Sequence, residues 1–440
     1  MLTTEAWIRQ LREEITSLRE EGADVDAAER QLDAIAAGNL DPSHLPALQA
    51  SLQTSVTRSD FPYAEPVALE EIQMLRPEGP RSLPVWLPPD LLFDRIYGGW
   101  LGRAAGCLLG KPVEGWKKEE IEETLRFCNA WPLSDYFPPV PDNDRGLGYP
   151  PHATSWLRGN ITCMPRDDDM DYPILGLHTL EESGPCPNAA AIAGQWLAHL
   201  PYHMVYTAER VAYRNLVNGI EPPLSGRYHN PYREWIGAQI RADIWGWVNP
   251  GEPERAAAMA YADAEVSHIK NGAYGEMLFA AMLSAAFIVD DIEEVITIGL
   301  SEIPAECRLA EAVRDVLAWS KESSDWEETF RRIREKYGHY HPVHTINNAV
   351  VVLMSLLHGQ KEFGKTISIA VMAGWDTDCN GATAGSVLGT LLGANALPEA
   401  WVAPLNDRLH SIVTGFSETR LSELAQRTCA QVEKVASVQG

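Results

Sequence analysis

The sequence predicts an all-α protein, a compact bundle of many helices that carries a short N-terminal helical hairpin. Apolar residues recur at helical spacing over most of the 440 residues, and the alternating or β-branched runs that are typical of strands are few. Hydrophobic residues make up 45% of the chain and charged residues 22%, which is the balance of a globular protein with a sizeable core. Because a single core rarely exceeds about 300 residues, we expect one large domain and an appendage.

The appendage is predicted at residues 1–58. Apolar residues recur every three or four positions in residues 4–21 and 25–37, and Gly22 and Gly38 stand where two such helices would end. Two amphipathic helices with a brief connection bury their apolar stripes on each other or on a larger body. The sequence therefore predicts a helical hairpin.

A proline-rich segment, residues 59–89, follows the hairpin. Prolines remove backbone donors and stiffen the chain, so this segment is predicted to be an extended linker before a main domain at residues 90–440. Inside that domain, residues 127–166 are rich in Pro, Gly and aromatic residues. They predict a long irregular loop, and such loops in compact domains usually serve function.

Two glycine ladders stand out in the main domain. Four glycines spaced four residues apart occur twice: Gly98, Gly102, Gly106 and Gly110, and Gly381, Gly385, Gly389 and Gly393. Each helical glycine costs about 0.5 to 1 kcal/mol relative to alanine, so a ladder needs compensation, unless the clustering is due to chance. Close packing of two backbones is the usual compensation, and we expect two central helices here.

Charge and cysteine usage limit the partners. With 36 Lys and Arg against 61 Asp and Glu, the net charge of -25 argues against nucleic acid. The seven cysteines are odd in number and scattered, as in a reduced, cytoplasmic protein, and no apolar run approaches the roughly 20 residues of a membrane span. We expect a cytoplasmic protein that binds no membrane; the sequence indicates no oligomeric state.

Two acidic segments are candidates for a metal site. Asp167, Asp168, Asp169 and Asp171 fall within five residues at the predicted start of a helix, where they either cap free amides or bind a divalent cation. Asp376 and Asp378 lie between apolar runs, again in front of a predicted helix. Burying these two charges without a partner would cost several kcal/mol, which implies a cation or a hydrogen-bond cage.

Three motifs resemble those of the ADP-ribosylglycohydrolase family. Residues 96–114 resemble its opening motif, which ends in a proline and a glutamate. Residues 167–170 resemble its threonine-aspartate-aspartate-threonine motif, and residues 374–380 its closing glycine-aspartate-threonine-aspartate-threonine-asparagine motif. Ser267-His268 matches a threonine-histidine step between them. The motifs keep the family order.

The resemblance implies an all-α catalytic domain, residues 90–440, with two Mg²⁺ ions, or with one, for which Mn²⁺ can substitute. It implies catalytic roles for Glu114 and Asp169. The implied metal ligands are Asp167, Asp168, Asp169, Asp376, Asp378 and Cys379.

Departures from the family pattern bear on the second ion. Cys379 and Met170 stand where the family has threonines, Cys107 stands where it has an aspartate, and Asp167 stands where it has a threonine ligand. A neutral thiol is a poor ligand for magnesium, whereas Asp167 would be a stronger ligand than threonine.

Three further residues are candidate substrate contacts. Trp375 adjoins the closing motif and offers a face for a base or a sugar, although it can equally belong to the core. His268 is a site histidine or a structural one, and Gly110 lies just before Glu114.

Together these features predict a metal-dependent glycohydrolase that cleaves an N- or O-ribosyl bond of a small-molecule or protein-linked, ADP-ribosyl-like substrate. A non-catalytic member that binds ADP-ribose-like ligands or has a structural role is the first alternative. A phosphohydrolase that uses two ions is the second.

Overall fold

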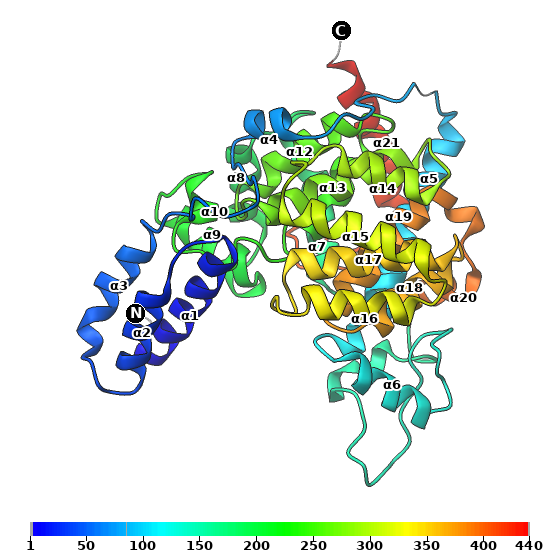
Figure 1. The fold of residues 1–440 in the computed structure, drawn as a ribbon. Helices are drawn as coiled ribbons and strands as arrows, with labels where there is room; N and C mark the ends of the chain where they lie inside the picture. Colours follow the sequence, from blue (N-terminus) through cyan, green and yellow to red (C-terminus); the bar gives the residue numbers. More distant parts are fainter. Residues whose placement is uncertain (1–2, 85, 439–440) are drawn as a thin grey trace.

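The computed structural model describes residues 3–84 and 86–438, and helices dominate this part of the chain (Figure 1). The only sheet in the described ranges is a pair of two-residue antiparallel strands, β1 (Leu409–His410) and β2 (Glu418–Thr419). The all-α prediction is confirmed. The α-helices are α1 (Thr4–Glu20), α2 (Asp26–Ala36), α3 (Leu45–Leu52), α4 (Leu69–Leu75), α5 (Pro89–Gly110), α6 (Lys118–Phe127), α7 (Asp168–Ser183), α8 (Ala189–His199), α9 (Thr207–Val217), α10 (Leu224–Arg227), α11 (Ala242–Trp247), α12 (Pro253–Ala264), α13 (Asn271–Ala286), α14 (Ile292–Leu300), α15 (Arg308–Glu322), α16 (Trp326–Tyr337), α17 (Thr345–Gly359), α18 (Phe363–Met372), α19 (Thr377–Leu392), α20 (Glu399–Val402) and α21 (Leu421–Ser437). Short 3-10 helices are η1 (Pro42–His44), η2 (Lys111–Val113), η3 (Pro151–Trp156), η4 (Tyr202–Met204), η5 (Gln239–Arg241), η6 (Ala394–Ala396) and η7 (Ala403–Leu405).

The two glycine ladders lie on α5 and α19, which pack against each other at the centre of the main domain. Apart from Gly393, each glycine of one ladder meets a backbone group at the other helix, so that a Cβ at any of these seven positions would clash with main-chain atoms. The ladders therefore serve close helix packing, as the spacing predicts. Gly393 is the exception, because it ends α19 in a left-handed conformation with φ of +83°.

The remaining helices of the main domain surround this pair. Helix α13 is buried along its whole length and contacts both α12 and α19, while α17 and α18 cover α19 from another side. The C-terminal α21 packs on α5. This arrangement explains why α13, α19 and the part of α5 from Ile96 onward have apolar or small residues on nearly every face, since these segments are buried.

The N-terminal appendage holds a third helix besides the two predicted ones. Helices α1, α2 and α3 share a hydrophobic core of their own, to which Leu11, Leu32 and Leu48 contribute. Figure 1 shows this unit extending from one side of the main domain. It is attached by buried ion pairs: Glu14 and Glu21 of the appendage both bind Arg233 of the main domain, at 3.0 and 2.6 Å.

Residues 59–89 do not form the extended linker that the prolines predict. They include α4, whose Ile72 is completely buried in the main core. Glu65 forms an ion pair with Arg308 at 2.7 Å, and Arg81 binds Glu302 at 2.8 Å. The proline count indicated stiffness but carried no information about these long-range partners, which fix the segment on the main domain.

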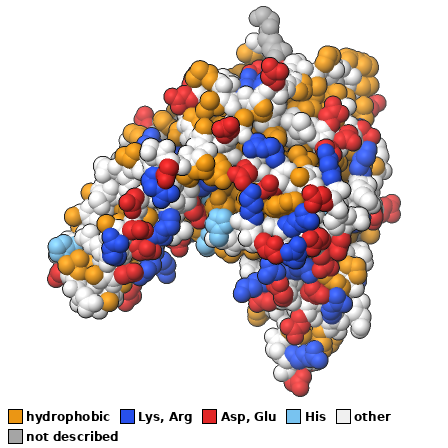
Figure 2. All heavy atoms as spheres, in the orientation of Figure 1, with side chains coloured by type: hydrophobic (Ala, Val, Ile, Leu, Met, Phe, Trp, Pro, Cys, Tyr) orange, Lys and Arg blue, Asp and Glu red, His pale blue; other side chains and the backbone are white. Residues whose placement is uncertain are grey.

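Residues 127–166 are largely irregular, as predicted, and contain only the short helix η3. With α6 they form a projecting lobe at the lower end of the view in Figure 1. On the face drawn in Figure 2, an indentation separates this lobe from the N-terminal unit, and acidic and basic side chains alternate along its rim. No helix in the described residues is long and apolar enough to cross a membrane.

Candidate active site

The first acidic segment caps a helix, and its side chains also reach into the interior of the protein. Asp167 is the N-cap of α7, and its Oδ1 accepts a hydrogen bond from the amide of Asp169 at 3.0 Å. Its Oδ2 accepts from Nζ of Lys111, the residue that follows α5. Burial opposes ionisation of Asp167, but the Lys111 ammonium, the amide of Asp169 and the charge of Arg166 together lower the pKa of this carboxyl. Asp167 is therefore a carboxylate with a partner already in place.

Arg103 ties the start of α7 to the central helix pair. This fully buried guanidinium of α5 donates to the backbone oxygen of Asp169 at 2.6 Å and to its Oδ1 at 2.8 Å. Its other side binds Oδ2 of Asp243 at 2.7 Å. The second oxygen of Asp169 accepts from Sγ of Cys379 at 3.1 Å, so both carboxylate oxygens are occupied.

The second acidic segment begins with a left-handed turn. Gly374 and Trp375 have φ of +82° and +66°, and a Cβ at Gly374 would meet the backbone of Trp116 and Lys118. Backbone hydrogen bonds of 2.9 and 3.0 Å join Trp375 to Gly115 and Trp116. This bridge holds the turn that carries Asp376 against the residue after Glu114.

Glu114, Asp376 and Asp378 form an all-carboxylate group, in which one oxygen of each lies within 4.8 Å of the others. Asp376 and Asp378 are 6% and 5% exposed, while Glu114 is exposed. The charge of the neighbouring Asp378 is the main cause that raises the pKa of Glu114 to about 8. Burial raises the pKa of Asp376 and of Asp378 as well. The charges of neighbouring carboxylates raise both pKa values further. Oδ1 of Asp378 is buried without a hydrogen-bond partner.

This group suits a hard divalent cation. Its donors are oxygens alone, none of the three carboxylates forms an ion pair within the described residues, and the orphaned Asp378 oxygen would gain a ligand bond. Two neighbouring groups of side chains are less suitable for a divalent cation. The first consists of Asp169, Asp378 and Cys379, and the second consists of Cys107, Asp167 and Asp169. Burial raises the pKa of both thiols, which keeps them neutral, and Arg103 and Lys111 already occupy carboxylate oxygens there.

Comparison with known proteins identifies the family of the chain. The family model described as ADP-ribosylglycohydrolase matches residues 88–436. The chain belongs to the ADP-ribosylglycohydrolase family. A solved structure titled "ADP-ribosylglycohydrolase-related protein complex" is among the similar proteins, with 20% sequence identity and a TM-score of 0.49 over 79% of this chain and 99% of that chain. Comparison with curated proteins gives no match.

This ADP-ribosylglycohydrolase domain brings five of the six expected metal ligands into the three groups just described. Asp168 is the sixth. It is half-buried at the first position of α7 and belongs to none of these groups, although the charges of Asp167 and Asp378 act on it.

The expected substrate contacts have other surroundings. Gly110 is buried against the carbonyl of Thr377, whose Oγ1 donates to the Gly110 oxygen at 2.8 Å. His268 is fully buried, and its Nδ1 lies 2.8 Å from Oγ of Ser267. Gly110 offers no side chain, and Nε2 of His268 is buried without a hydrogen-bond partner in the described residues, so substrate contact by either residue stays a prediction. Trp375 is half-buried, with its ring edge-on to Phe330 at 5.5 Å.

Sequence reasoning missed Lys111, Arg103 and Asn348. Asn348 of α17 accepts from the amide of Asp376 at 3.4 Å and from Nδ2 of Asn380 at 2.8 Å, which braces the closing motif. Lys111 and Arg103 both lie inside the run 96–114 that carries the opening motif. Arg103 is the one charged residue between Ile96 and Gly110, and a lone basic residue in so apolar a run was the available signal for it.

Proposed function

We propose that this chain is a metal-dependent glycohydrolase that cleaves an N- or O-ribosyl bond and holds a single divalent cation, Mg²⁺ or Mn²⁺, at Glu114, Asp376 and Asp378. The observation that carries the proposal is the convergence of these three carboxylates without a basic partner in the described residues, next to an unpartnered oxygen of Asp378. Like charges held together in a low-dielectric site favour a cation between them.

A second cation is not required by this geometry. Lys111 and Arg103 supply two fixed positive charges to the other half of the acid cluster, where they bind Asp167 and Asp169. Cys379 offers a neutral thiol at the position between Asp169 and Asp378. Side chains of the protein therefore offset part of the negative charge of that half.

The cation and the surrounding side chains have different roles in the proposed reaction. When bound, the cation would supply a Lewis acid that binds the ribosyl hydroxyls and stabilises negative charge. Glu114 is the exposed carboxylate of the group, and it is placed to take or give a proton at its carboxylate oxygen. Asp169, which is 1% exposed and fully hydrogen-bonded, holds α7 in place, so its role is positioning and not the catalytic role expected from the resemblance.

A product assay tests the proposal. The full chain would be incubated with ADP-ribosylated peptides, ADP-ribose and simple ribosides, with Mg²⁺ or with EDTA. Release of a ribosyl or ADP-ribosyl product with Mg²⁺, lost in EDTA and in Asp378→Asn, is the expected result. Asp90→Asn, at an exposed position in the first turn of α5, is the control and should leave release unchanged.

Three outcomes contradict the proposal. Inorganic phosphate as the product would indicate a phosphohydrolase, and no product from any substrate would indicate a non-catalytic member. Undiminished release in EDTA would exclude the metal.

A further inference from the structure

A groove lies between the N-terminal unit and the main domain. One end is a pocket of about 520 Å³, between Trp7 and Gln49 on one side and Tyr228 and His229 on the other. The other end, of about 450 Å³, runs along α9 past Tyr206 and Arg210. Gln10 and Arg214 line both ends, so we treat them as one feature, the hairpin groove. Pockets of this size bind small molecules.

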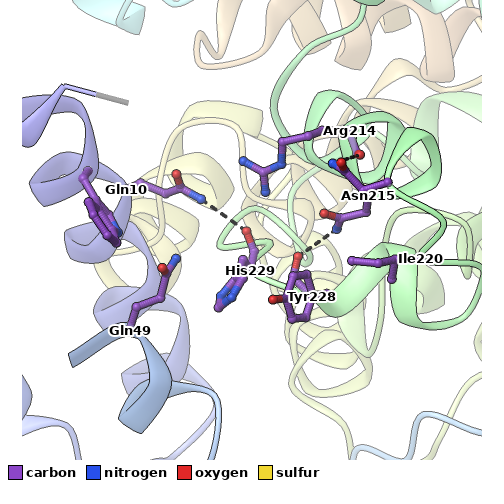
Figure 3. A pocket seen from close by; sticks show the side chains of 9 residues that line it. Gln10, Gln49, Arg214, Asn215, Ile220, Tyr228 and His229 are labelled. Atoms are coloured by element: carbon purple, nitrogen blue, oxygen red, sulfur yellow. Dashed lines mark hydrogen bonds between the residues drawn. The ribbon is translucent and has the colours of Figure 1, made fainter. Parts of the chain in front are cut away.

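The N-terminal unit forms one wall of the groove. Figure 3 shows Gln10 and Gln49 facing Arg214, Tyr228 and His229 across the space, and Gln10 donates to the backbone oxygen of His229 at 3.2 Å. The family match begins at residue 88. The residues of this wall therefore lie outside the matched region, whereas Arg214, Tyr228 and His229 of the opposite wall lie within it.

Unpaired arginines gather in the groove. Arg9, Arg210 and Arg214 line it, and none has a carboxylate oxygen within 4.0 Å in the part of the chain that the structure describes. Arg210 is held by the backbone oxygens of Val205 and His203, at 2.7 and 3.2 Å. Such a gathering is unexpected in a chain with 61 acidic and 36 basic residues.

The arginine spacing favours an anionic ligand. Arg210 and Arg214 stand at i and i+4 on α9, where like charges repel each other and weaken a helix. Glu13 is the one acidic residue among those that line the groove, so it can offset only one of the three arginine charges. An anion between the two guanidinium groups would relieve the repulsion.

Exposed aromatic faces accompany the arginines. Tyr202, Tyr206 and Tyr228 are 37%, 41% and 45% exposed, and all three line the groove. They are the only tyrosines among the exposed large hydrophobic side chains of the described residues. Trp235 is stacked on His341 with ring centroids 4.0 Å apart, which makes a rigid aromatic edge at the same end as Tyr206. Exposed rings of this kind stack on flat aromatic ligands.

One end of the groove adjoins the acid cluster. Arg166, the residue before Asp167, donates to the hydroxyl of Tyr206 at 3.1 Å and also binds Asp171 at 2.8 Å. Arg166 and Arg210 lie over the Tyr206 ring, each 5.6 Å from its centroid. A ligand at Tyr206 would therefore be one side chain away from the start of α7.

We propose that the hairpin groove is a binding site for a nucleoside phosphate, whose base stacks on the exposed tyrosines and whose phosphates pair with Arg210 and Arg214. A nucleoside phosphate is the ligand class that has both a flat aromatic face and an anionic group. The nucleotide is either a free ligand or the nucleotide portion of the substrate.

Titration calorimetry of the full chain with ADP, in EDTA, tests the site without the metal. We expect saturable binding of ADP that Arg214→Gln weakens about tenfold or more, which corresponds to about 1.4 kcal/mol. Tyr228→Leu should also weaken ADP binding. Arg30→Gln is the matched control, because Arg30 is exposed on α2, lines neither pocket and likewise has no ion pair in the described residues.

The remaining measurements decide between sources and between failures. A raised KM in Arg214→Gln identifies the nucleotide portion of the substrate, whereas inhibition by ADP that this variant loses identifies a free nucleotide. Absence of ADP binding, equal binding by pyrophosphate alone, or loss of ADP binding in Asp378→Asn but not in Arg214→Gln would overturn the proposal. Failure of the glycohydrolase proposal would leave the ADP titration intact, so the two are distinguishable.

Discussion

Gly102 of α5 lies directly against the backbone carbonyl of Gly385 in α19, and Gly385 lies in the same way against the carbonyl of Gly102. The contact repeats one turn away in each direction along the two helices. At the end of the series Gly110 meets Thr377, the first residue of α19. The glycine contacts therefore set the spacing between Glu114, just beyond α5, and Asp378.

Gly385→Ala should destabilise the protein, because its methyl group would meet the Gly102 backbone, which has no free volume to yield. The expected loss is about 1 to 3 kcal/mol in a denaturant melt, typical of overpacking. Gly194→Ala is the control. Gly194 lies in α8 with open space around it, so this variant should gain about 0.5 to 1 kcal/mol from helix propensity. A stabilised Gly385→Ala protein would show that α5 and α19 separate easily.

Helical periodicity and the glycine spacing were enough to predict the all-α fold and the central helix pair. Both are local sequence patterns, and each indicates which face of a helix must be buried. The prolines of residues 59–89 misled the prediction, because stiffness says nothing about partners such as Glu302, which lies more than 200 residues from Arg81. Helix α3 was missed for lack of a strong amphipathic stripe in its eight residues.

The sequence predicted which acidic residues make up the site, but not which side chains each of them contacts. The acidic segments were identified because burying adjacent carboxylates is costly unless a cation or a hydrogen-bond donor compensates their charge. Which carboxylate meets Lys111, Arg103 or a thiol depends on how α5, α7 and α19 cross, and no spacing in the sequence encodes that crossing. His268 shows the same limit, since its match to a family step could not indicate that its side chain is fully buried.

The number of bound ions should depend on Lys111 and Cys379. Calorimetry of the native chain with Mg²⁺ should give one ion. The double variant Lys111→Met and Cys379→Thr should bind two, because it frees Oδ2 of Asp167 and replaces a soft thiol by a hydroxyl that suits a hard ion. Cys429→Thr, on α21, is the control with unchanged binding. Binding of two ions by the native chain, or of one ion by the double variant, would contradict the proposal that the Lys111 ammonium takes the place of a second cation.

Arg103→Met should strongly destabilise the fold. The variant leaves the carboxylates of Asp169 and Asp243 buried without their cation, a situation that typically costs about 3 to 5 kcal/mol. Arg95→Met, on the same helix, removes a half-buried guanidinium whose one hydrogen bond is to the Thr390 oxygen at 3.3 Å. It should cost about 1 kcal/mol. Urea melts measure both variants, and similar losses would mean that Arg103 is not the anchor of α7.

Glu20, at the end of α1, faces the main domain in a crowded acidic environment. Its side chain is 14% exposed, and its Oε2 lies 3.8 Å from Nε2 of His344. Burial lowers the pKa of His344 to about 3, so this imidazole is neutral and offers no charge to the carboxylate. Burial, followed by the charge of Glu234, raises the pKa of Glu20 to about 8. The other charged groups that act on it are Arg308, Glu21 and Glu13.

The stability contributed by Glu20 should therefore fall as the pH rises. Between pH 4.5 and about 8 the folded state keeps a proton that the unfolded state has lost, so each increase in pH in this window favours unfolding, and above pH 8 the full penalty is present. Glu20→Gln removes the titration. Relative to the native chain, this variant should be little changed in stability near pH 4.5 and more stable at pH 8.5, by at least about 1 kcal/mol. Glu5→Gln, at an exposed position of the same helix, should show no such dependence. Urea melts at the two pH values measure the difference, and a Glu20→Gln variant that loses stability at pH 8.5 would show that Glu20 is ionised and paired in the folded chain.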